Sequence, residues 1–475
     1  MKRERGGHEP DTLADVAGGK ARGTLFHQQP VNGQAIFMGQ CAQRVDDIGG
    51  FHGGVRYYDY YRNINRHVAA TYNAFMIETR DRHWLYAAVL ARSLATGMMG
   101  VLLGIYLASA ELDAKAIGVV IGLGLAGAAS ATLVVTFLSD RFGRRRTLLV
   151  ITALSVLGAF LLAAASSPFV LGFAAFIGMV NGMGRDRGAA LVVEQSVLPA
   201  TARDSQRTLA FAQYNVLQDI GHAAGSLLAA APTLMQRFTP LDDAQSLRMS
   251  ILVYAALSLL PFVAYLRLSK RIEVPRSPRT AVSAQTRQVL LKLSGLFAID
   301  AIGGGFLTTA LLAYFFYERF GVGIEAIGLL FFAARVANAL SHFAAAWLAR
   351  RIGLVNTMVF THIPSSFLLL TVPFMPTFPV AAALFLLRES LVEMDVPTRQ
   401  SYVMAVVRPE ERTFASGITH LVRMAGWAVA PAIAGILMTG TSLAAPLVAG
   451  ATLKILYDLA LWRAFRRLRP PEESA

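Results

Sequence analysis

The chain has 475 residues, of which 55% are hydrophobic and 16% are charged, and its formal net charge is +14. Because roughly a quarter of the residues of a soluble domain are charged, this composition excludes an ordinary soluble protein and indicates a membrane protein embedded in the lipid bilayer. Loops that face an anionic membrane surface explain the positive charge better than nucleic acid does, so we expect no nucleic-acid partner.

Residues 1–75 differ from the rest of the chain. They contain no apolar run long enough to cross a bilayer and no signal-peptide pattern of positive charge followed by an apolar stretch. Two interpretations stay open: a disordered cytoplasmic extension, or upstream sequence translated because the start was assigned too early. We favour the second, because the stretch from Met76, MIETRDRHWLYAAVL, resembles an ordinary start with Arg80 and Arg82 just inside the membrane.

Apolar runs recur along the chain from residue 84 onward, and a helix needs about 20 such residues to cross the hydrocarbon core. The candidate spans lie at 84–109, 117–138, 147–166, 169–199, 208–235, 249–268, 289–316, 326–349, 354–374, 378–406, 413–438 and 442–465. The predicted fold class is therefore an all-α integral membrane protein with twelve transmembrane helices. Some runs exceed a straight crossing, which predicts tilt, kinks or extension beyond the bilayer.

Lys and Arg are far more numerous in the even-numbered connections and in the C-terminal tail than in the odd-numbered connections. Positive residues are retained on the cytoplasmic side of a membrane. We therefore expect a multi-pass protein of the cell membrane with both termini in the cytoplasm.

The chain also repeats itself. The stretch EQSVLPATARDSQRTLA at 194–210 aligns with RQSYVMAVVRPEERTFA at 399–415, and Arg92 of span one falls on Asp300 of span seven in a similar alignment. Two six-helix halves in the same orientation are implied, and parallel halves of this kind are a transporter design with the binding site between them at mid-membrane. The predicted domains are the extension at 1–75, a first half at 76–268, a cytoplasmic linker at 269–288, and a second half with a short tail at 289–475.

A dense basic stretch, SDRFGRRR at 139–146, separates spans two and three. It resembles the loop signature of the major facilitator superfamily, and the matching residues are Asp140, Arg141, Gly143, Arg144 and Arg145, while Thr136 stands where the signature opens with Gly. The resemblance implies the two-halved fold of that family and a conformational latch, in which the acid faces the exposed N–H groups that begin span eleven. The alternative is that the stretch only fixes topology and loop shape.

Polar side chains inside the spans are costly in hydrocarbon and normally face the protein interior or a water-filled cavity. Spans five and eight each carry several at three- and four-residue spacing, so each set lies on one face of its helix. We predict that a substrate or coupling cavity is lined by eight of these residues, six chosen by their depth and Arg92 and Asp300 by their equivalent places in the repeat: Arg92, Asp219, His222, Asp300, Arg335, Asn338, Glu389 and Arg423.

Other polar residues have structural explanations. Asp395 and Arg399 are four residues apart and are expected to pair within one helix. His362, alone on span nine, is expected to be a satisfied packing residue. The charges at 185–187 either join neighbouring helices or belong to the site, and the sequence leaves this open.

The equivalent places of Arg92 and Asp300 suggest a pair across the two halves. An unpaired charge inside a membrane costs a few kcal/mol, so each residue needs a partner. We expect the two to pair when the cytoplasmic side is closed, with charges of span ten or eleven as alternative partners.

The family resemblance implies a secondary active transporter that moves a small solute by alternating access, and not an enzyme. The sequence contains no phosphate-binding loop and no spacing typical of a metal site, so we expect no cofactor and no metal. We expect a proton or ion gradient to supply the energy for transport. We also expect the protein to be a monomer. The Gly-rich stretch GHAAGSLLAAAP at 221–232 resembles the antiporter signature of span five in that family, and this resemblance favours efflux by proton antiport. The alternatives are an uptake symporter or facilitator for an organic anion or metabolite, and then a membrane enzyme or a non-transporting receptor.

Overall fold

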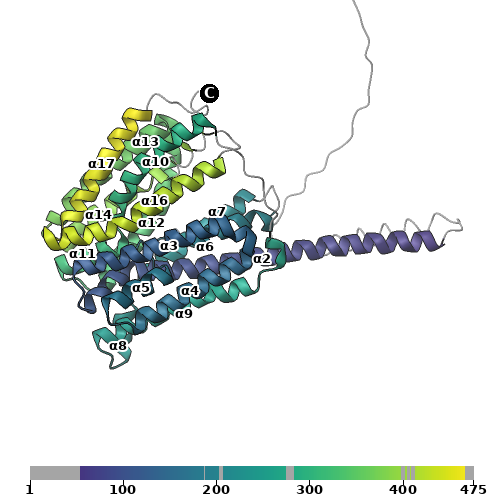
Figure 1. The fold of residues 1–475 in the computed structure, drawn as a ribbon, viewed down its shortest axis with the longest axis horizontal. Helices are drawn as coiled ribbons and strands as arrows, with labels where there is room; N and C mark the ends of the chain where they lie inside the picture. Colours follow the sequence, from purple (N-terminus) through teal and green to yellow (C-terminus); the bar gives the residue numbers. More distant parts are fainter. Residues whose placement is uncertain are drawn as a thin grey trace, which may run out of the picture. The chain divides into compact units, whose positions relative to one another are not determined.

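The computed structural model describes residues 54–186, 188–202, 207–273, 283–396, 399, 402–403, 407 and 412–465. Every regular element in this part of the chain is a helix, which confirms the all-α fold class (Figure 1). The helices are α2 (Gly54–Ser109), α3 (Ala114–Phe142), α4 (Arg144–Ala164), α5 (Pro168–Gly178), α6 (Ala189–Val197), α7 (Arg207–Leu228), α8 (Ala231–Phe238), α9 (Asp243–Leu266), α10 (Ala284–Gly305), α11 (Thr309–Phe320), α12 (Ile324–Ile352), α13 (Leu354–Thr371), α14 (Phe378–Val392), α16 (Arg412–Gly440) and α17 (Ala445–Phe465). Short 3-10 turns follow α6, α9 and α13.

The chain forms two compact units, residues 1–71 and 72–475, and the helices that can cross a membrane belong to the second. Of the expected extension at 1–75, residues 1–53 lie outside the described part of the chain, and the remainder is the beginning of α2. Most of the expected linker at 269–288 also lies outside it.

Nine helices in the described residues are long and apolar enough to cross a membrane. They coincide with expected spans one to three, six to nine, eleven and twelve. The helix expected at 208–235 instead ends at Leu228, carries the polar stripe that lowers its hydropathy, and is followed by the separate short helix α8.

The other two expected spans, at 169–199 and 378–406, are interrupted. α5 ends at Gly178 and α6 begins at Ala189, because the turn between them holds Met179 at φ 51°, a left-handed conformation that stops a helix. α14 likewise ends at Val392, where a turn follows. These two spans are equivalent in the internal repeat, and interrupted helices at corresponding positions of two halves indicate where a transporter binds its substrate.

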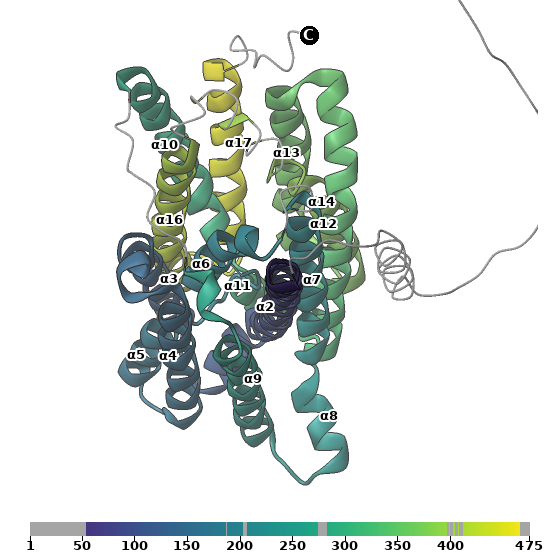
Figure 2. The ribbon, with the colours of Figure 1, turned by 90° about the vertical axis from the view of Figure 1, so that its right-hand side faces the viewer.

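The helices divide into two groups that correspond to the two halves of the repeat. Contacts between the groups are made by α3 against α16 and by α7 against α12 (Figure 2). One apolar core contains side chains of both halves, among them Ile121 and Phe316, whereas two further cores belong to one half each, around Leu148 and around Leu293. The shared core lies toward the end of the helices at which α2 joins α3 and α16 joins α17, so the halves are packed together there.

Glycine makes this packing possible where α3 crosses α16. A Cβ atom on Gly118 would lie 2.2 Å from the carbonyl oxygen of Pro431, and one on Gly435 would lie 2.3 Å from that of Ala114. Real side chains do not approach a backbone oxygen so closely, so the two helices touch backbone to backbone only because these residues lack a side chain.

Gly435→Ala is therefore expected to force the two helices apart. Overpacking of this kind costs roughly 1–3 kcal/mol, which should lower the Tm of the purified protein in a fluorescence-monitored thermal scan. Gly440→Ala, on the same helix, is the matched control because nothing lies within 4 Å of the added Cβ. Its Tm should be unchanged or higher, and equal values for the two variants would contradict the close crossing.

Candidate functional site

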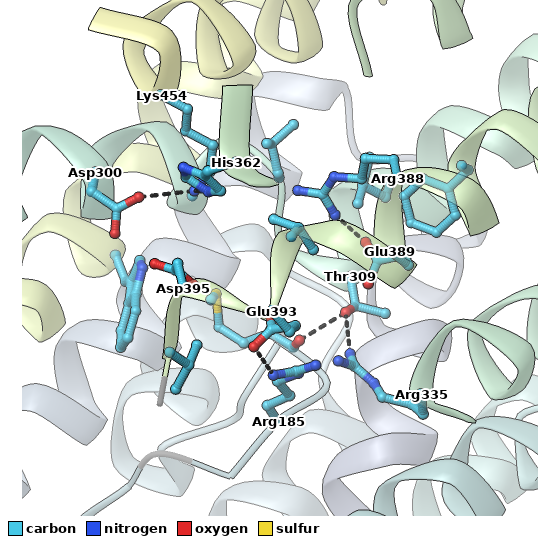
Figure 3. Close-up of a pocket in the computed structure, with 18 of the residues that line it drawn as sticks. Arg185, Asp300, Thr309, Arg335, His362, Arg388, Glu389, Glu393, Asp395 and Lys454 are labelled. Atoms are coloured by element: carbon cyan, nitrogen blue, oxygen red, sulfur yellow. Dashed lines mark hydrogen bonds and ion pairs between the residues drawn. The ribbon is translucent and has the colours of Figure 1, made fainter. Parts of the chain in front are cut away.

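The interrupted spans meet at a cavity of about 100 Å³ between the two halves (Figure 3). Most of its lining comes from the second half, and the turn between α5 and α6 of the first half lies against it. Charged side chains dominate the lining: the cations are Arg185, Arg335, Arg388, Arg399, Arg423 and Lys454, and the acids are Asp300, Glu389, Glu393 and Asp395. Cations therefore outnumber acids around this cavity.

The turn between α5 and α6 is held in place by its own polar groups. The Asn181 side chain donates to the carbonyl oxygen of Arg185 at 2.6 Å and accepts from the backbone N–H of Met183 at 2.8 Å. The Thr309 hydroxyl, at the start of α11, donates to the carbonyl oxygen of Met183 at 2.7 Å. The interruption thus places the Arg185 side chain at the cavity and docks the first half onto the second.

Arg185 joins the two interrupted spans directly. Its guanidinium lies 2.6 Å from the carboxylate of Glu393, the first residue after α14. Beside this pair, Arg388 contacts Glu389, and the side-chain amide of Asn338 donates to Glu389 at 2.8 Å. Most charges at the cavity therefore have an opposite charge next to them.

Arg335 is the exception. Its Nη2 donates to the Thr309 hydroxyl at 3.1 Å, but its buried Nε has no hydrogen-bond partner, and among the described residues it forms no ion pair. Figure 3 shows its guanidinium beside that of Arg185, a like charge. A partly buried cation with a buried, unused donor atom, next to another cation, is a favourable place for an anion.

Arg92 belongs to a separate network inside the first half. Its guanidinium contacts Asp186, and it donates to Glu194 at 2.6 Å and to the Tyr265 hydroxyl at 2.7 Å. The hydroxyls of Tyr214 and Tyr265 also donate to Glu194, each at 2.6 Å, so this fully buried carboxylate is satisfied on both oxygens. One cation here faces two acids.

Asp300 occupies the corresponding place in the second half and has the opposite surroundings. It accepts from Lys454 at 2.9 Å and from Arg423 at 3.0 Å, and Arg399 lies 3.7 Å away. The expected pair of Asp395 with Arg399 within one helical stretch is present. One acid here faces three cations, an arrangement that mirrors the Arg92 network with the charges reversed.

The pairing of Arg92 with Asp300, which the sequence predicts for a closed cytoplasmic side, is not formed in this structure. Asp300 instead takes the alternative partners on spans ten and eleven, and Arg92 takes partners in its own half. The physical reason is that a charge in a low-dielectric interior needs a counter-charge at all times, and a partner in the same half remains in contact when the halves move.

The eight residues predicted for one cavity are thus distributed. Asp300, Arg335, Glu389 and Arg423 line the cavity between the halves, Arg92 lines a smaller one of about 70 Å³ in the first half, and Asp219, His222 and Asn338 lie outside both linings. His222 Nε2 accepts from the backbone N–H of Asp186 at 2.8 Å, which ties span five to the interrupted turn. Asp219 is exposed.

The basic stretch between α3 and α4 is organised around Gly143, which ends one helix at φ 91° and begins the next. The Glu273 carboxylate accepts from the backbone N–H groups of Arg144 at 2.7 Å and Arg145 at 3.2 Å, where the helix dipole favours an anion. The Asp140 side chain lies outside the described residues. The latch therefore stays a prediction.

Lys454 and Asp458 escaped the sequence-based prediction although both belong to the charged network of the second half. They lie four residues apart on α17, in an otherwise apolar span. Charges inside a transmembrane helix are a sufficient signal to single them out.

The chain is similar in sequence to one protein family and in structure to known membrane transporters. The family model described as Major Facilitator Superfamily matches residues 85–392 and 293–475. An uncharacterized membrane protein of Saccharomyces cerevisiae is 24% identical over 422 residues, which cover 82% of this chain and 94% of the yeast protein. Among solved structures, the nucleoside transporter NupG superposes with a TM-score of 0.65 at 14% identity, covering 81% of this chain and 99% of NupG. A bacterial homologue of the human lysosomal transporter Spinster, in an inward-facing conformation, gives a TM-score of 0.61 at 13% identity, covering 82% and 95%.

Proposed function

Because this chain belongs to the major facilitator superfamily and is a membrane transporter rather than an enzyme, we propose that it carries a small organic anion by alternating access. The observation that carries the proposal is Arg335, a partly buried cation at the cavity whose buried Nε has no hydrogen-bond partner and which forms no ion pair with any described residue. A carboxylate suits it best, since the planar guanidinium matches a carboxylate with two parallel hydrogen bonds.

The charge balance of the cavity supports the same substrate class. Its acids are already occupied, Glu389 by Arg388 and Asn338 and Glu393 by Arg185, so a cationic substrate would have to break an existing ion pair. The volume of about 100 Å³ is well below the roughly 300–1,000 Å³ of sites for drug-sized ligands, which favours a small solute.

The distribution of the apolar cores supports alternating access. One core shared by both halves at one end, and a separate core in each half at the other, allows the halves to rock as rigid bodies about the site between them. Export by proton antiport stays a prediction that rests on the Gly-rich stretch at 221–232.

A thermal-stability screen with matched ligand pairs tests the proposal. Purified protein is scanned with benzoate against benzamide, lactate against lactamide, and succinate against succinamide, alongside sugars and hydrophobic cations. A ligand that binds the folded state raises Tm, and at a concentration about 100 times Kd the gain is about 2.7 kcal/mol. We expect at least one carboxylate to raise Tm while its amide does not. Stabilisation confined to neutral or cationic compounds would overturn the proposal.

A ligand that passes the screen is then used in counterflow with proteoliposomes. An alternating-access carrier exchanges labelled for unlabelled substrate across the membrane, whereas a channel or a receptor built on the same fold does not. We expect exchange, and binding without exchange would exclude a carrier for that compound.

A further inference from the structure

His362 is a buried histidine of the second half with a charged group on each side of its ring. Only 1% of its surface is exposed. Its Nδ1 lies 2.9 Å from both carboxylate oxygens of Asp458, and its Nε2 lies 3.3 Å from the Nζ of Lys454. The sequence suggested a packing residue, but the structure gives this imidazole two ionisable partners on α17.

The hydrogen-bond pattern determines which ring nitrogen carries the proton. A lysine ammonium has three donors and no acceptor, so Lys454 donates and His362 Nε2 must present its lone pair. The other nitrogen, Nδ1, therefore carries the hydrogen and donates it to Asp458. The ring is neutral in this arrangement, and Nε2 is the atom on which a second proton would be placed.

The same lysine connects the ring to the cavity. Lys454 donates to Asp300 at 2.9 Å, and Asp300 also accepts from Arg423 at 3.0 Å. His362, Lys454 and Asp300 all line the cavity between the halves (Figure 3). Asp458 is not part of the lining and is fully buried. A continuous chain of hydrogen bonds therefore runs from a buried carboxylate to the cavity.

We propose that His362, Asp458 and Lys454 form a proton-binding site that adjoins the anion cavity. A proton taken from solvent forms an N–H bond at His362 Nε2, and the resulting imidazolium is stabilised by Asp458 at 2.9 Å. The hydrogen bond from Lys454 to Nε2 breaks because two cations now face each other at 3.3 Å, and Lys454 turns further toward Asp300. No other bond changes and no group is oxidised or reduced.

The surroundings contain no second acid in direct contact with the ring among the described residues. The charged and titratable groups next to it are Asp458, Lys454 and Tyr457 from α17 and Asp300 from α10. Arg423 from α16 and Arg388 from α14 line the same cavity. Imidazole changes charge near neutral pH more readily than any other side chain, so the ring is the member of this set suited to load and release a proton.

If the protein carries an anion, as proposed above, the proton site couples proton binding to anion binding. A proton on His362 adds positive charge at the edge of the cavity and frees Lys454 from the ring, and both changes favour an anion there. Proton and anion would therefore load together and move in the same direction, which is symport and differs from the export by proton antiport that the Gly-rich stretch at 221–232 predicts. A coupling of this kind typically changes affinity about 5- to 150-fold.

The test measures protons and needs no substrate. Purified full-length protein is titrated between about pH 8 and pH 5.5, the range in which histidine changes charge, and the protons taken up per chain are counted. His362→Gln keeps both hydrogen bonds, because an amide donates and accepts, but cannot be protonated. We expect this variant to take up about one proton fewer than the wild type.

Two further variants serve as a detection control and as a second test of the proton site. His83→Gln removes an exposed histidine and shows that the loss of one proton is detected. Asp458→Asn retains His362 but removes the carboxylate that stabilises its charged form, so it should also lower uptake over this range. An unchanged titration for His362→Gln or for Asp458→Asn, with the His83→Gln difference present, would overturn the proton site. Because no anion is used, failure here leaves the anion proposal standing, and failure of the carboxylate screen leaves the proton site standing.

Discussion

Arg335→Gln is expected to abolish carboxylate binding and to raise the Tm of the ligand-free protein. The glutamine amide keeps a hydrogen bond to the Thr309 hydroxyl, but the positive charge that attracts the anion is gone. Losing one partner of a buried, hydrogen-bonded charge pair costs about 2–5 kcal/mol, which corresponds to roughly 30- to 4,000-fold in Kd. The stability should move in the opposite direction, because a partly buried cation that has no ion-pair partner among the described residues is itself unfavourable.

A loss of carboxylate binding together with a gain in stability distinguishes an anion-binding role of Arg335 from a structural role. The measurement is the Tm of purified protein with and without the carboxylate that stabilises the wild type. Arg350→Gln, at the exposed C-terminal end of α12, is the control and should change neither value. Unchanged ligand stabilisation in Arg335→Gln would remove this residue from the site, and a lower ligand-free Tm would show that its charge is compensated in the folded protein.

The double exchange Arg92→Asp with Asp300→Arg is expected to be at least as damaging as the worse of the two single variants. In the first half, the single cation that faces Asp186 and Glu194 would become a third acid. In the second half, the acid that faces Lys454 and Arg423 would become another cation. Breaking one buried pair by removing a partner costs about 3–5 kcal/mol, and here both networks are broken with repulsion added.

Expression level and Tm of the folded membrane protein measure this outcome. The matched comparison is a variant in which the Arg92 network carries no charge, namely Arg92→Leu together with Asp186→Asn and Glu194→Gln. This triple variant should recover much of the stability that Arg92→Leu alone loses, because no buried charge is left without a partner. Recovery of wild-type Tm by the double exchange would instead mean that Arg92 and Asp300 compensate each other directly across the halves.

Much of the fold was predictable because the membrane makes strong demands on sequence. Apolar runs of sufficient length placed nine spans that the structure also has, and a transmembrane segment must satisfy its backbone within the helix. The interruptions at Met179 and after Val392 were not predicted, because the surrounding stretches remain apolar enough to read as continuous spans. The cluster NGMGRDRG at 181–188 is the local signal for the first interruption.

The composition of the site was predicted better than its connections. Asp300, Arg335, Glu389 and Arg423 were singled out as charges at membrane depth, and all four line the cavity. The partner of each charge was not predictable, since it depends on how far each helix is rotated about its axis and on which neighbour it faces. The pairing of Asp395 with Arg399 was predictable because both lie on one helical stretch, four residues apart.

The sequence by itself determined the class of the protein, its helical architecture and its two-halved repeat, because hydropathy, charge distribution and internal alignment are properties of the chain alone. Only the tertiary structure decided that Arg92 and Asp300 are neutralised separately, that Arg335 forms no ion pair with any described residue, and that His362 is held between Asp458 and Lys454. These are contacts between residues 26 to 154 positions apart in the chain. Their energies depend on distance and burial, and neither quantity exists until the helices have packed together.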